Sequence, residues 1–135
     1  MIMIKKITNK DIINGSFVIP DGVTKIGLGA FYGCSSLSSI IIPESVTKIG
    51  DYAFEGCRSL SSIIIPDGVT KIGLGAFSDC WRLESIIIPE SVTEIGDYAF
   101  EGCRSLKKVS LPKKVKLGID VFDGRHPDLE IIFRD

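Results

Sequence analysis

Apolar and polar residues alternate in short runs along this chain. In one such run, Ile40 and Ile42 share one face of an extended segment. Ser39 and Ile41 share the opposite face. The run ends at Pro43, because proline has no N–H to donate to a sheet. The pattern predicts a short strand here, and matching strands at 14–19, 60–65, 83–88 and 106–111.

The rest of each repeat predicts a reversal of direction followed by a compact turn. Turn-forming residues follow the proline, after which Val46 and Ile49 are expected to point inward. The segment 51–54 is short enough for one helical or 3₁₀ turn that ends near Gly56. Each repeat is therefore expected to contribute one clear strand and one compact return segment.

These elements recur with a period of 23 residues. A fixed period of this length indicates a stack of units that share one core, since no unit can bury its own apolar face. The sequence predicts one domain with no linker: 1–19 as an N-terminal cap and first strand, 20–111 as four repeats, and 112–135 as a degenerate C-terminal capping repeat. The marker positions are Pro20, Pro43, Pro66, Pro89 and Pro112, with Phe31, Phe54, Phe77 and Phe100, and Cys34, Cys57, Cys80 and Cys103.

The two ends depart from the repeat. We expect Ile2, Ile4 and Ile7 to fold over the open edge of the first strand, at 14–19. In the last repeat, 115–118 is one residue shorter than its counterpart and 122–129 is one residue longer. These changes are expected to compensate, so that 129–134 forms a final strand in register. His126 lies in this degenerate unit and is expected to be a capping residue rather than a ligand or a base.

The four cysteines are expected to be reduced and buried. They occupy equivalent positions, so stacking spaces them by about 4.8 Å, whereas a disulfide needs its two Cβ atoms about 3.8 Å apart. Cysteine at a repeated core position behaves as a small apolar residue. No Cys-x-x-Cys pair occurs and the single histidine lies beyond the ladder, so no metal site is expected.

Composition narrows the classes of partner. The formal net charge of −1 argues against a nucleic-acid partner. No segment approaches the roughly 20 apolar residues of a membrane span, and the first residues do not resemble a signal peptide. We therefore expect no nucleic-acid or membrane partner. A complete chain is expected in the cytoplasm, and a fragment of a longer protein outside the cell or on its surface.

Sequence signals for catalysis are weak. There is no Gly-x-Ser-x-Gly elbow and no phosphate-binding glycine loop. We expect no enzyme activity, no catalytic residues and no cofactor.

The repeat resembles a known family. Leu60-Ser-Ser-Ile-Ile-Ile-Pro66, Val69-Thr-Lys-Ile-Gly73, Ala76-Phe77 and Cys80-Trp-Arg-Leu83 are similar to the unit of BspA-like, or Treponema-type, leucine-rich repeats. The resemblance implies a right-handed, β-rich solenoid with a parallel sheet on its concave face and short 3₁₀ or irregular convex segments. It also implies protein interaction, since such repeats occur in bacterial and protist surface proteins that bind partners.

The alternation predicts which side chains face outward on the concave sheet. One column is Ser39, Ser62 and Ser85, and the next is Val18, Ile41, Ile64 and Ile87. A contiguous exposed apolar stripe tends to mark a partner surface. It can also reflect the β-propensity of isoleucine alone. Trp81 and Arg82, of residue types enriched at binding hot spots, are secondary candidates for partner contact.

The leading hypothesis is a non-catalytic protein–protein interaction module that binds a partner, or itself, through the concave face. The alternative is a structural role: a designed or consensus repeat scaffold, or a fragment of a longer surface protein with no function of its own. Repeats that alternate as two near-identical types fit either recent duplication or design.

Overall fold

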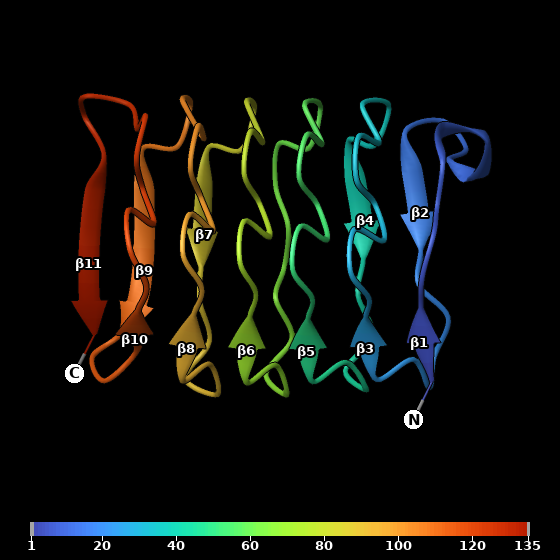
Figure 1. The fold of residues 1–135 in the computed structure, drawn as a ribbon, viewed down its shortest axis with the longest axis horizontal. Helices are drawn as coiled ribbons and strands as arrows, with labels where there is room; N and C mark the ends of the chain where they lie inside the picture. Colours follow the sequence, from blue (N-terminus) through green and yellow to red (C-terminus); the bar gives the residue numbers. More distant parts are fainter. Residues whose placement is uncertain (1, 135) are drawn as a thin grey trace.

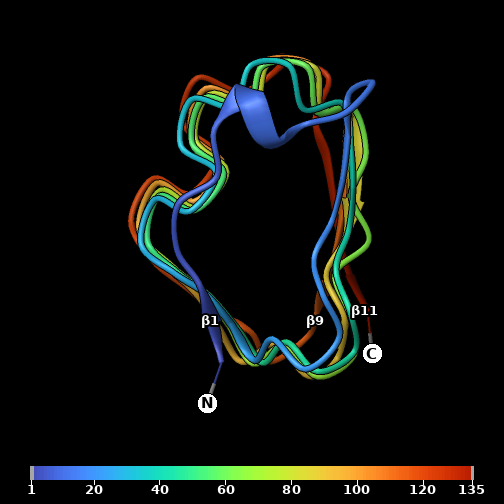
Figure 2. The same cartoon turned by 90° about the vertical axis from the view of Figure 1, so that its right-hand side faces the viewer.

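The computed structural model describes residues 2–134. The chain winds into a β-solenoid whose coils lie side by side in a row (Figure 1). Each register pair along the stack is parallel, and Lys25 pairs with Lys48, which pairs with Lys71. Seen along the stack, successive coils overlay closely around a common interior (Figure 2). The predicted fold class, a parallel-strand solenoid, is confirmed.

Two sets of strands lie on opposite sides of the stack. The longer strands form what we call the long-strand face, which corresponds to the predicted concave sheet: β2 (Ser16–Val18), β4 (Ser39–Ile41), β7 (Ser85–Ile87), β9 (Lys108–Pro112) and β11 (Glu130–Arg134). Short strands form a continuous six-stranded sheet opposite: β1 (Met3–Ile4), β3 (Lys25–Ile26), β5 (Lys48–Ile49), β6 (Lys71–Ile72), β8 (Glu94–Ile95) and β10 (Lys116–Leu117).

This second sheet forms where the sequence predicted only a reversal. Five of its six strands are followed by glycine, because neighbouring coils approach closely there: a Cβ at Gly50 would lie 2.6 Å from the Ile26 carbonyl oxygen. The segments that follow are turns rather than helices. Tyr52 adopts φ of 57°, which interrupts a right-handed helical turn. The only 3₁₀ segment between residues 2 and 134 is η1 (Asn9–Asp11).

The core consists of columns of identical side chains. Phe31, Phe54 and Phe77 stack with nearly parallel rings, at centroid distances of 5.0 and 5.2 Å. The stack continues through Phe100 to Phe122. Each phenylalanine of the stack before Phe122 therefore packs against rings from the coils on both sides of its own, as the shared core of a solenoid requires.

The predictions for the two ends were wrong in detail. The N-terminal strand β1 pairs with β3, so it covers the edge of the short-strand sheet rather than the edge of the first long strand. At the other end, Ile131 pairs with Val109, a shift of 22 residues instead of 23. The last strand therefore keeps the offset created by the shorter unit before it.

Candidate interaction surface

The long-strand face carries the predicted apolar stripe on its solvent side. The buried partners of the alternation are Ile40, Ile63 and Ile86, which point into the core. The exposed fractions of the stripe are 61% for Val18, 63% for Ile41, 84% for Ile64 and 70% for Ile87. Ser39, Ser62 and Ser85 form the adjacent exposed column, and the hydroxyl of Ser39 lies 2.8 Å from that of Ser16.

The sheet beneath the stripe is interrupted in its middle. The segment 61–66 is not a strand, so β2 pairs with β4, and β7 with β9 and β11, as two separate groups. Ile19 N–H donates to Ile41 O and Ile88 N–H donates to Ser110 O, but among the described residues neither Ile42 nor Ile65 makes the equivalent bond. Beside this interruption a largely apolar cleft of about 430 Å³ lies between Ile64 and Ile87.

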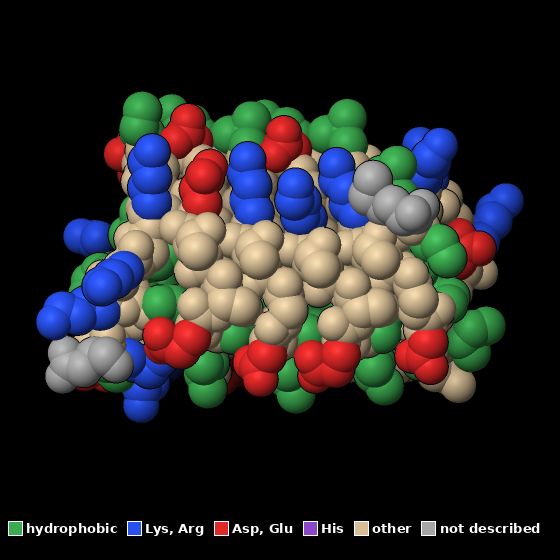
Figure 3. All heavy atoms as spheres, turned by 90° about the horizontal axis from the view of Figure 1, so that it is seen from below, with side chains coloured by type: hydrophobic (Ala, Val, Ile, Leu, Met, Phe, Trp, Pro, Cys, Tyr) green, Lys and Arg blue, Asp and Glu red, His purple; other side chains and the backbone are tan. Residues whose placement is uncertain are grey.

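Charged residues form rows along the lower side of the coils. Asp21, Glu44, Asp67 and Glu90 are exposed where the long strands end. Figure 3 shows an acidic row along one margin and a mainly basic row along the other. Arg134 lies at the C-terminal side of the stripe. It forms an ion pair of 3.0 Å with Glu90 and donates to the Ser110 hydroxyl at 2.6 Å.

A cluster of stacked side chains lies on the upper side of the coils, where the long strands begin. The guanidinium carbon of Arg58 lies 4.0 Å from the centroid of the Trp81 ring, and that of Arg104 lies 3.9 Å from it. Trp81 is half-buried, and Arg82 beside it is exposed. The sequence analysis singled out Trp81 and Arg82 but missed the two arginines. The signal was present, because residues 58, 81 and 104 are equivalent positions one period apart.

Burial affects the ionisable side chains that line the inside of the stack. All four cysteines are free and buried, as predicted. The Cys57 thiol donates to Phe31 O at 3.2 Å, and burial raises its pKa to about 12. On the turn side, burial raises the pKa of Glu55, with smaller contributions from Asp79 and Glu101. Buried thiols with raised pKa values are poor nucleophiles, so this ladder is structural.

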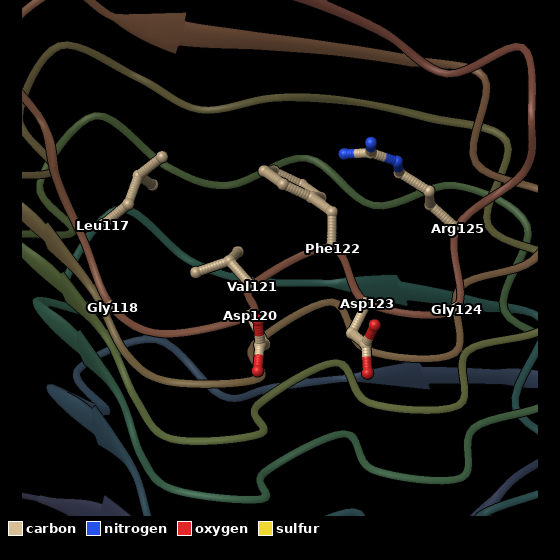
Figure 4. Close-up of a pocket in the computed structure, with 8 residues that line it drawn as sticks. All are labelled: Leu117, Gly118, Asp120, Val121, Phe122, Asp123, Gly124 and Arg125. Carbon is tan, nitrogen blue, oxygen red and sulfur yellow. The ribbon is translucent and has the colours of Figure 1, made fainter.

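A second hollow, of about 400 Å³, lies at the C-terminal end of the stack. Figure 4 shows Leu117, Val121 and Phe122 on the inner side of the last coil. The carboxylates of Asp120 and Asp123 point the opposite way from these three side chains, and Arg125 points the same way as Phe122. The hollow is thus at the open end of the stacked core, and both apolar and charged side chains line it.

Neither a metal-ion cluster nor a membrane-spanning helix is found in the part of the chain that the structure describes. Among residues 2–134, no three His, Cys, Asp or Glu side chains are placed to share a metal ion. His126 accepts a hydrogen bond at Nδ1 from the Asp128 N–H, at 2.9 Å, which fits a capping role. Over the same residues, no helix has the length and apolar character needed to cross a membrane.

Comparison with solved structures places this fold among bacterial leucine-rich repeat proteins. A leucine-rich cell surface protein of Faecalibacterium prausnitzii is 36% identical, with a TM-score of 0.84 over 90% of this chain and 32% of its own. The leucine-rich repeat protein of T. pallidum is 28% identical, with a TM-score of 0.59 over 85% of this chain and 78% of its own. The pneumococcal vaccine antigen PcpA is 22% identical, with a TM-score of 0.79 over 98% of this chain and 34% of its own, and shows the shared fold alone.

The chain spans about a third of the first of these relatives. No curated protein matches the sequence with significance. The family description that does match is the BspA type leucine-rich repeat region, with six copies over residues 7–126. That match covers nearly all of the stack, and proteins of this family are typically non-enzymatic interaction or surface modules. The chain therefore belongs to the BspA-type leucine-rich repeat family.

Proposed function

We propose that this chain is a non-catalytic module that binds an extended segment of a partner protein across its long-strand face. The observation that carries the proposal is the stripe of Val18, Ile41, Ile64 and Ile87, whose side chains are 61–84% exposed along the stack. A contiguous apolar patch is unusual on the surface of a soluble monomer and tends to mark an interface.

The energetics favour a partner that covers the whole stripe. Fully burying one valine or isoleucine side chain is worth roughly 1.5–3 kcal/mol, so four together offset a large part of the cost of association. The cleft of about 430 Å³ between Ile64 and Ile87 can receive an apolar side chain of the partner. Shape and apolar surface thus coincide in the middle of the face.

Relatives support a location as well as a role. The 36%-identical protein of Faecalibacterium prausnitzii is described as a cell surface protein, and we propose that the present face also acts outside the cell. Cleavage by a protease added to intact source cells supports this location. Protection of the chain in intact cells supports the cytoplasmic alternative.

The stripe is tested with a triple variant. Ile41→Thr, Ile64→Thr and Ile87→Thr together keep β-branching but remove apolar surface. A displayed random peptide library selected on the wild-type chain should yield apolar-rich peptides that lose at least about tenfold in affinity for the triple variant. Leu28→Thr is the matched control, since Leu28 is 74% exposed on another part of the molecule. It should leave peptide binding unchanged.

Three outcomes decide between the candidates. Peptides that bind the triple variant as well as the wild type would show that the stripe is not the site. Concentration-dependent sedimentation of the wild type that disappears in the triple variant would identify a second copy as the occupant. If neither peptides nor self-association depend on the stripe, the alternative of a structural repeat scaffold is favoured.

A further inference from the structure

The Arg58–Trp81–Arg104 stack has a geometry suited to a ligand. The two arginines come from coils on either side of Trp81, so they cover opposite faces of its ring. Two guanidinium groups at these distances on one face would collide. Their carbons therefore lie at most about 8 Å apart, the separation reached when both are centred over the ring. The indole acts as a spacer that fixes both cations.

Stacking leaves the donor edges of both guanidinium groups open. A guanidinium that lies flat on an aromatic ring still directs its N–H groups outward in its own plane, where they can bind a carboxylate at two points. Among the described residues, neither Arg58 nor Arg104 has a side-chain hydrogen bond or an ion pair. Arg134 differs, because its guanidinium is engaged by Glu90 and Ser110.

A hollow of about 520 Å³ lies beside the Arg58–Trp81–Arg104 stack, and further hydrogen-bond donors line it. Arg82, Lys107 and His126 line it together with the hydroxyls of Ser61 and Ser105. Its remaining lining residue, Glu84, carries the opposite charge. Ser61 and Lys107 directly precede Ser62 and Lys108 of the long-strand face, so the hollow lies next to that face.

We propose that the Arg58–Trp81–Arg104 stack binds two carboxylates of an acidic, extended segment of the partner protein. Alternate side chains of an extended strand lie roughly 7 Å apart, close to the separation of the two guanidinium groups. The inference rests on the proposed function, since it names the chemistry of the segment that would cover the stripe. It is an addition to the apolar contact and not a substitute for it.

The surroundings favour a polypeptide over a sulfated polysaccharide. A uniformly anionic chain would meet Glu84 in the hollow and the acidic row of Glu44, Asp67 and Glu90 at the lower border. It would also leave the apolar stripe exposed. A polypeptide can place carboxylates at the stack and apolar side chains against Ile64 and Ile87.

The test uses a short fluorescein-labelled peptide with a Glu-Val-Glu core and its Gln-Val-Gln counterpart. Binding is followed by peptide anisotropy and by the emission of Trp81, the only tryptophan in the chain. The Glu peptide should bind, shift Trp81 emission and weaken with added salt. Arg58→Gln with Arg104→Gln should lower its affinity at least about tenfold. Lys25→Gln with Lys48→Gln, which removes the same charge from the short-strand sheet, should leave it within about twofold.

Further variants keep the two proposals separable. Trp81→Leu retains both charges but removes the spacer, and should also weaken the Glu peptide if positioning matters. If the isoleucine triple variant loses binding while the arginine double variant keeps it, the stripe stands and this inference fails. The reverse result supports the stack and overturns the stripe. Equal binding of the Gln peptide, or tighter binding of heparin than of the Glu peptide, overturns the inference. A double variant that does not fold is replaced by Arg104→Gln alone, with folding checked by circular dichroism.

Discussion

Two segments of this molecule have the same sequence and different structures. Residues 37–43 and 60–66 both read Leu-Ser-Ser-Ile-Ile-Ile-Pro. The first contains β4, which pairs with β2, whereas the second is not a strand and borders a cleft. Local sequence therefore determines which side chains face the core in both segments, but the pairing of the backbone depends on the neighbouring coils.

The opposite side of the same coils behaves differently. β5 pairs with β6 without a gap, through Lys48 with Lys71 and Ile49 with Ile72. The interruption is thus confined to one face of the stack. How far it extends into the core can be tested by core mutation, by thiol titration and by hydrogen exchange.

The largest effect is expected in the aromatic stack beneath the interruption. Phe54 and Phe77 are both fully buried, and their rings lie 5.2 Å apart, as closely as those of Phe77 and Phe100. Phe54→Ala and Phe77→Ala should each lower the free energy of unfolding by about 3–5 kcal/mol in urea denaturation. Phe133→Ala, at a 54% exposed position, is the control and should cost under about 1 kcal/mol. A much smaller cost at Phe77 than at Phe54 would show that the interruption reaches the core.

A smaller effect is expected from the thiol ladder at high pH. Burial, with a smaller contribution from Cys34, raises the pKa of Cys57 to about 12, while an unfolded thiol ionises near about 8.5. Between these values the folded chain keeps a proton that the unfolded chain has lost. The free energy of unfolding should therefore fall by up to about 1.4 kcal/mol for each pH unit above about 8.5.

This pH dependence is measured as a difference between wild type and Cys57→Ala, so that titration of lysine and tyrosine cancels. The wild type should lose stability more steeply as pH rises. Parallel curves would mean that Cys57 is accessible to solvent, which would again extend the opening into the core.

The smallest effect, and the most direct test of the comparison, is the exchange of backbone amide hydrogens. The Ile19 and Ile88 N–H groups are bonded across the ladder, whereas in residues 2–134 those of Ile42 and Ile65 have no such partner. Ile42 and Ile65 should exchange at least about tenfold faster than Ile19 and Ile88. Equal protection at all four sites would show that the ladder closes in solution.

Much of the fold could be predicted because the same pattern is repeated. The period placed Phe54 and Cys57 in the core, and the alternation placed Ile41 and Ile64 on the solvent side. The role of the exposed residues in binding a partner stays a prediction. The short second sheet was missed because its strands have two residues each, too few to show an alternation.

Other features could not be read from local pattern. The interruption at 61–66 leaves no trace in the sequence, since 37–43 is identical. The offset of β11 was missed because the longer segment at 122–129 was expected to restore the register, whereas β11 pairs with β9 at a shift of 22 residues. The Arg58–Trp81–Arg104 cluster was within reach, because comparing equivalent positions in adjacent repeats brings the three residues together.

The one-sided interruption has a mechanical consequence. A solenoid with intact ladders on both sides resists bending in either direction, since bending must stretch hydrogen bonds on one side. Between the coils that contain β4 and β7, backbone hydrogen bonds are continuous through the short strands and the turns that follow them, but not along the long-strand face. The stack should therefore flex most easily there by widening or narrowing the long-strand side, while the short strands and the turns that follow them stay hydrogen-bonded. Ile64 and Ile87 lie on either side of the cleft that such bending would open. The stiffness of the stack at this position would therefore control how bulky a side chain the cleft can admit.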